Sequence, residues 1–110
     1  RLIDEESSNL KDRRNISFNG LMDICLIVSK KGIIERSPLI NLRGLPLNEQ
    51  EFNEIKYELE DRIFDICKSY SLNNKKQESN LIDSLKISLK KIIQIRLAKK
   101  PFTSINLIRL

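Results

Sequence analysis

Histidine is absent from these 110 residues. Imidazole is the usual ligand in zinc and mixed-metal hydrolase sites and the usual base beside a nucleophile, so its absence argues against both kinds of catalysis. Glycine is also scarce, and Gly20, Gly32 and Gly44 lie too far apart to form a phosphate-binding loop. We therefore expect no catalytic residue and no metal ligand in this chain.

Long apolar runs are absent as well, since none approaches the roughly 18 residues that span a bilayer. No basic-then-apolar signal peptide opens the chain, so we expect a cytoplasmic protein without a membrane partner. The first residue is Arg1 rather than Met, which is consistent with a piece of a longer protein. Cysteine is rare, and Cys25 and Cys67 both lie in apolar stretches, which favours buried free thiols over a disulfide.

The chain changes character at Leu21. Residues 1–20 are polar and without a sustained period, and we interpret them as a linker or the end of a preceding domain, followed by one domain over residues 21–110. The run LMDICLIVS predicts a strand with one fully apolar face, formed by Met22, Ile24, Leu26 and Val28. A turn at Lys30-Lys31-Gly32 and an extended run from Ile33 to Leu45, interrupted by Pro38, complete a predicted β-hairpin.

Two helices follow the hairpin. Asn48 with Glu51 three residues later fits a capping box, and the first helix has one apolar face, made of Phe52, Ile55, Leu59, Ile63, Ile66 and Tyr70. We expect a loop from Ser71 to Glu78. A second helix should run from about Asn80 to near Lys100, before Pro101, with a buried side made of Ile82, Leu85, Leu89, Ile92 and Ile93.

The last segment, FTSINLIRL, predicts a third strand. The predicted fold class is α/β (α+β), with a small three-stranded sheet, the order β-β-α-α-β, and both helices packed on one face of the sheet. Charge is uneven along this order. Asn48 to Tyr70 holds three basic and seven acidic residues, whereas Ser71 to Leu110 holds nine basic and two acidic residues.

Three segments in this order resemble a known family. KDRRNISFNG (Lys11 to Gly20) resembles the linker that leads into the C-terminal domain of bacterial ribonuclease J. SKKGIIERSPLINLRGLP (Ser29 to Pro46) is similar to the hairpin of that domain, and KKPFTSINLIRL (Lys99 to Leu110) is similar to its closing segment. The alphaproteobacterial branch of the family looks closest.

The resemblance implies a parent enzyme that degrades and matures RNA. It would join a metallo-β-lactamase core to a β-CASP domain and cut as a 5′-to-3′ exonuclease and as an endonuclease, with two metal ions, expected to be zinc. Those ions belong to the catalytic region, and no catalytic position of the family is matched here. Residues 1–20 would then be the linker or the end of the catalytic core. The C-terminal domain would support subunit association and full activity.

Basic residues form the first candidate site. Lys86 and Lys90 are one helical turn apart, Lys91 is adjacent, and Arg96 follows. Such a cluster could neutralise RNA phosphates, although a basic last turn also stabilises a helix and lysines solubilise any surface. The possible RNA-binding residues are Arg13, Arg14, Lys86, Lys90, Lys91, Lys99 and Lys100.

Apolar residues outside the predicted core form the second candidate site. Tyr57 and Phe64 lie off the apolar face of the first helix, and Ile87 and Ile95 lie opposite that of the second. Cys25 and Ile27 lie on the back of the first strand. We interpret these six residues as a possible interface with a second copy, in a dimer or higher homo-oligomer, or with the rest of the enzyme.

Three functions remain open. The favoured one is a non-catalytic C-terminal accessory domain of a ribonuclease J that supports oligomerisation or domain assembly and meets RNA through the parent enzyme. The alternative is a free-standing RNA-binding module that uses the basic C-terminal half. A third possibility is an unrelated regulatory dimerisation domain.

Overall fold

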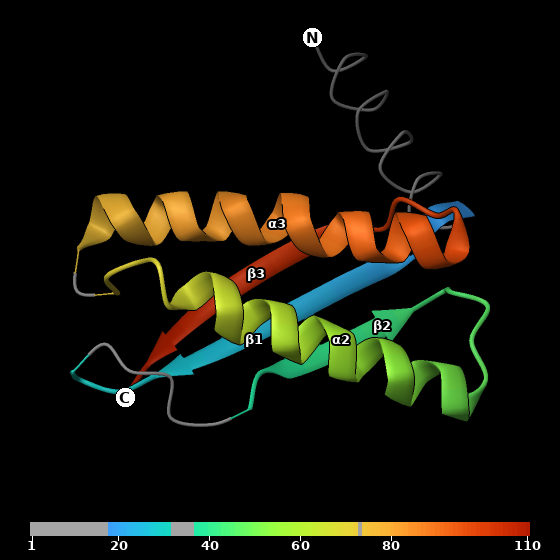
Figure 1. Cartoon of the computed structure of the whole chain (residues 1–110), viewed down its shortest axis with the longest axis horizontal. Coiled ribbons are helices and arrows are strands. Elements are labelled where there is room, and N and C mark those ends of the chain that lie inside the picture. The colour runs from blue at the N-terminus through green and yellow to red at the C-terminus, as the bar shows by residue number, and fades with distance from the viewer. Residues whose placement is uncertain (1–17, 32–36, 73) are drawn as a thin grey trace, which may run out of the picture.

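The computed structural model describes residues 18–31, 37–72 and 74–110. Three strands and two long helices follow the order β-β-α-α-β, as predicted. They are β1 (Leu21–Val28), β2 (Leu39–Arg43), α2 (Glu49–Cys67), α3 (Lys75–Leu97) and β3 (Phe102–Arg109). Figure 1 shows both helices lying side by side over the same face of the sheet, which confirms the predicted two-layer arrangement.

The first strand is the centre of the sheet, whose order is β2-β1-β3. It pairs antiparallel with β2, from Leu21 opposite Arg43 to Cys25 opposite Leu39. It pairs in parallel with β3 over its whole length, from Leu21 beside Phe102 to Val28 beside Arg109. Parallel neighbours need a long crossover, and α2 and α3 together supply it.

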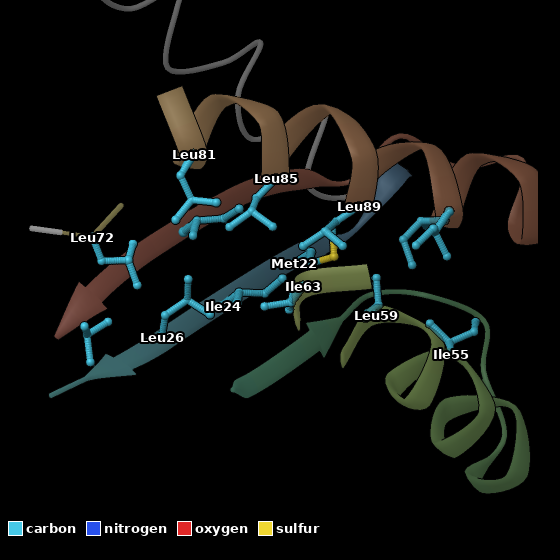
Figure 2. Packing of buried hydrophobic residues seen from close by; sticks show 14 residues of the cluster. Met22, Ile24, Leu26, Ile55, Leu59, Ile63, Leu72, Leu81, Leu85 and Leu89 are labelled. Atoms are coloured by element: carbon cyan, nitrogen blue, oxygen red, sulfur yellow. The ribbon is translucent and has the colours of Figure 1, made fainter. Parts of the chain in front are cut away.

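The alternation of fully buried and partly buried side chains along β1 shows where the core lies. Its four even-numbered residues, Met22, Ile24, Leu26 and Val28, are fully buried, while the odd-numbered ones are only partly buried. The buried side chains meet Ile55, Leu59 and Ile63 of α2 and a row of leucines from α3, as Figure 2 shows. Successive strand residues point to opposite faces, so a single buried face is expected for a sheet with helices on one side.

The predicted hairpin is confirmed in the residues that the structure describes. β2 begins immediately after Pro38, as expected for a residue that cannot donate to a β-ladder. Lys30 and Lys31 lie in a turn, whereas Gly32 and Ile33 of the predicted turn and second run lie outside the described residues.

The capping box predicted for the first helix is present. The Asn48 side chain accepts a hydrogen bond from the backbone N–H of Glu51 at 2.8 Å, and the Glu51 carboxylate accepts one from the backbone N–H of Asn48 at 3.2 Å. Two otherwise unpaired donors are satisfied, which fixes the start of α2 at Glu49. The helix ends at Cys67, so Tyr70 lies beyond it.

The predicted start of the second helix, near Asn80, is wrong. α3 begins at Lys75, because the side chain of Asn74 accepts from the backbone N–H groups of Lys76 and Gln77 and so caps the helix. The Gln77 side chain in turn accepts from the backbone N–H of Ser71 at 2.7 Å. The second half of the polar stretch expected to be a loop, from Lys75 to Glu78, is therefore the first turn of a helix.

The second helix also ends earlier than predicted, at Leu97 rather than near Lys100. Ala98 takes a left-handed conformation with φ of 54° and donates its backbone N–H to the carbonyl of Gln94. This conformation ends the helix three residues before Pro101. The predicted buried side of this helix also lacks Leu81, which is fully buried, and includes Ile82, which is only partly buried.

Candidate interaction surfaces

Three of the predicted basic residues form an exposed cluster on α3. Lys86, Lys90 and Lys91 are all exposed, and none of them forms an ion pair with another described residue. Lys100 is exposed beyond the helix, where its backbone N–H donates to the side chain of Asn19. Arg13 and Arg14 lie outside the described residues.

Two further cations are held by contacts within the domain. Arg96 Nε donates to Glu58 Oε1 of α2 at 2.6 Å. Lys99 Nζ donates to the carbonyl oxygen of Phe18 at 2.9 Å and lies 3.9 Å from the centroid of the Phe18 ring. Of the predicted RNA-binding residues, Lys99 is therefore engaged in a structural cation–π contact that ties the segment before β1 to the segment before β3.

The four apolar residues predicted to lie off the core are on the solvent side of the helices. Tyr57 and Ile95 are each 76 % exposed, Ile87 is 72 % exposed and Phe64 is 39 % exposed. Each belongs to the side of its helix that points away from the sheet. We call this surface the outer helix face, defined by these four residues.

Contacts between α2 and α3 align the two helices. Arg96 pairs with Glu58, and Arg62 Nη1 donates to Ser88 Oγ at 3.4 Å. The helices run antiparallel, as Figure 1 shows, and each rises about 1.5 Å per residue. It follows that Tyr57 is level with Ile95 and Phe64 is level with Ile87. The structure thus places on one face of the domain residues that the sequence offered as two separate pairs.

Cys25 and Ile27 lie on the other side of the domain. They are partly buried on the back of β1, the sheet face that carries neither helix. The same face carries exposed apolar residues on the two outer strands: Leu39 opposite Cys25, Ile108 beside Ile27, and Phe102 beside Leu21 at the other end of β1. We call these five residues the sheet back. Near its middle Ser104 Oγ donates to Asp23 Oδ1 at 2.6 Å.

The six predicted interface residues therefore form two surfaces on opposite faces of the domain rather than one. The exposed residues of the sheet back, Leu39, Phe102 and Ile108, were missed by sequence reasoning. Their signal was available in the alternation of the outer strands, because residues two apart share a face. Sequence reasoning also missed Arg109, which donates from the end of β3 to the Leu72 carbonyl and to the Glu78 carboxylate.

The described residues offer no group of three or more histidine, cysteine or acidic side chains that could hold a metal ion. Cys25 and Cys67 are free and partly buried. Burial raises the pKa of the Cys67 thiol from 9.0 to about 11, so this thiol is a weak nucleophile at neutral pH. No helix in the described part of the chain is long and apolar enough to cross a membrane.

A family model described as the ribonuclease J C-terminal domain matches residues 8–110. No curated protein matches the chain.

Proposed function

Because this chain belongs to the ribonuclease J C-terminal domain family, we propose that it is a non-catalytic accessory domain that holds parts of a ribonuclease J together. The parent enzyme would act in RNA decay and maturation in the cytoplasm, as a 5′-to-3′ exonuclease and as an endonuclease. The two metal ions of that chemistry, expected to be zinc, would bind in its catalytic region. The donor set described here, without histidine and without a carboxylate or thiol cluster, does not fit them. An alphaproteobacterial lineage stays a prediction from three sequence segments.

The observation that carries the proposal is the sheet back. A small sheet that packs helices on one face gains stability when its other face is also covered, provided that face is apolar. Here the uncovered face carries Leu39, Phe102 and Ile108 beside Cys25 and Ile27. It is a mixed face, because the strand registers also place polar residues on it, namely Asp23, Asn41, Arg43, Ser104 and Asn106. We assign this face to the rest of the parent enzyme.

The test compares the parent enzyme with a form that lacks residues 18–110. We expect removal to weaken subunit assembly in sedimentation experiments and to lower the rate of degradation of 5′-monophosphorylated RNA. The double substitution Leu39→Lys with Ile108→Lys should have the same effect, because it places two charges on the sheet back without touching the core.

The matched control is Asn80→Lys, which adds a charge to an exposed position on α3. Circular dichroism of the isolated variants confirms that each still folds. The proposal is contradicted if neither the removal of the domain nor the double substitution changes the assembly or the activity of the enzyme.

One observation favours a second candidate, a free-standing RNA-binding module. Lys86, Lys90 and Lys91 are exposed and unpaired among the described residues, as a phosphate-binding patch requires. However, single-strand readers stack bases on aromatic rings, and Phe102, the aromatic residue of the basic half, lies on the opposite face of the domain. The assembly role is therefore the better-supported function.

A further inference from the structure

We propose that the outer helix face binds a second copy of this domain about a two-fold axis that runs along the helices, so that each α2 packs on the α3 of its partner. The inference rests on the proposed assembly role and adds to it a partner, a surface and a pairing of residues.

The first argument is the pattern of apolar residues. Two large side chains, Tyr57 and Phe64, are seven residues apart on α2, and two others, Ile87 and Ile95, are eight apart on α3. The alignment of the helices places Tyr57 level with Ile95 and Phe64 level with Ile87. A two-fold axis along the helices keeps these levels and exchanges α2 with α3. Each aromatic side chain then meets an isoleucine of the second copy.

The second argument is charge complementarity between the apolar contacts. On α2 the exposed residues Asp61 and Asp65 lie in this region beside the exposed Arg62, and on α3 the exposed residues Lys90 and Lys91 do. Over its whole length α2 holds seven acidic and two basic residues, whereas α3 holds six basic and two acidic residues. By the same alignment Asp61 is level with the turn that carries the two lysines. The exchange of helices therefore brings an acidic segment onto a basic one, twice in each dimer.

Charge also disfavours the other face-to-face arrangement. A two-fold axis across the helices, in the plane of the interface, would place α2 on the α2 of the second copy. Asp61 and Asp65 would then meet the same acidic residues, and Lys90 and Lys91 would meet lysines. Like charges in direct opposition disfavour association, so the axis along the helices is the arrangement that the sequence of charges allows.

A hollow on α2 lies in this region, lined by Glu58, Asp61, Arg62, Phe64, Asp65 and Lys68. Ile87 lies on α3 at the level of Phe64, so it would meet the Phe64 ring of the partner at the edge of this hollow. An apolar contact with charged residues around it is the usual composition of a protein–protein interface, which has an apolar centre and a polar rim.

The experiment uses charge reversal at the proposed contact, measured by sedimentation equilibrium of the 110-residue chain. Asp61→Lys and Lys91→Asp should each weaken self-association at least tenfold, because each places like charges opposite one another. An equal mixture of the two variants should associate about as tightly as the wild type, since in the mixed dimer each new charge meets an opposite one. Restoration by mixing cannot come from damage to the fold.

Lys86→Asp is the matched control. It lies on the same helix as Lys91, about 140° around α3 from it at 100° per residue. This control should leave the association unchanged.

Three results overturn the inference. They are a wild-type chain that stays monomeric at near-millimolar concentration, single variants that associate like the wild type, and a mixture that fails to restore association. If the chain dimerises equally well with and without each charge reversal, dimerisation uses another surface. That result would leave the proposed assembly role unaffected. The assembly role itself is decided separately, by the parent enzyme with and without the domain.

Discussion

At the scale of single residues, Cys67 illustrates how burial controls reactivity. Its pKa is raised from 9.0 to about 11. At pH 8 the thiolate population should therefore be ~100-fold below that of an ordinary thiol, and alkylation should slow accordingly. Iodoacetamide labelling followed by mass spectrometry measures this rate in the native chain and in urea. Equal rates in the two conditions would contradict the expectation.

The same shift makes stability depend on alkaline pH. The folded state holds the Cys67 proton more tightly than the unfolded state does. The stabilisation that this proton provides is complete below about pH 9.0 and is lost as pH rises towards about 11. Cys67→Ser should remove this part of the pH dependence.

Gly20 is a second residue whose effect can be measured. Its φ is 86°, and a Cβ atom there would lie 2.8 Å from the carbonyl oxygen of Arg43. Gly20→Ala should therefore lower the free energy of unfolding by about 1–3 kcal/mol, as thermal unfolding would show. Gly44→Ala serves as a control for the positive φ, since Gly44 has φ of 69°. A loss at Gly20 no greater than at Gly44 would mean that crowding against Arg43 contributes nothing.

At the scale of elements, the end of α3 is not optimal. Ala98 adopts the left-handed conformation, with φ of 54°, that glycine adopts without steric cost. We expect Ala98→Gly to raise the free energy of unfolding by about 0.5–1 kcal/mol, even though glycine costs more entropy in the unfolded chain. Gln94→Gly, within the same helix, should instead lower it by about 1 kcal/mol. Urea unfolding of both variants measures whether the free energy of unfolding rises for Ala98→Gly and falls for Gln94→Gly.

The two helix starts show what local sequence could and could not predict. Asn48 and Glu51 satisfy each other three residues apart, so the start of α2 could be read from the sequence. Asn74 also caps its helix, but the residues after it are polar and carry no apolar period until Leu81. The additional hydrogen bond from Ser71 to Gln77, which supports this cap, depends on how the chain turns between the helices.

At the scale of the whole molecule, the surfaces were only half predictable. Helical periodicity is enough to place Tyr57 and Ile95 in solvent, because it depends on neighbouring residues alone. The pairing of Arg96 with Glu58 joins residues 38 positions apart, and that of Lys99 with Phe18 joins residues 81 apart. Such contacts exist only once the tertiary structure has formed, so sequence reasoning counted both cations as available to RNA.

The basic patch that remains gives a prediction for RNA. Three exposed lysines without stacking aromatic rings should bind RNA non-specifically, with an affinity on the order of 10⁻⁴ to 10⁻⁶ M at physiological salt. Replacing Lys86, Lys90 and Lys91 by Gln should weaken binding about equally for all RNA sequences, as fluorescence anisotropy would measure. Lys75→Gln with Lys76→Gln, at the far end of α3, is the control. Salt-resistant binding that discriminates between sequences would support the RNA-binding module instead.

The parallel pairing of β1 with β3 also bears on how the domain is made. The central strand begins at Leu21, and its parallel partner begins 81 residues later, at Phe102. During synthesis, the hairpin and both helices leave the ribosome before the sheet can close, and Met22, Ile24, Leu26 and Val28 stay without their full cover until then. A messenger broken before the codons of β3 would therefore yield a chain in which β1 is an open sheet edge and a target for proteases. In this domain, therefore, the sheet can be completed only after β3 has been translated.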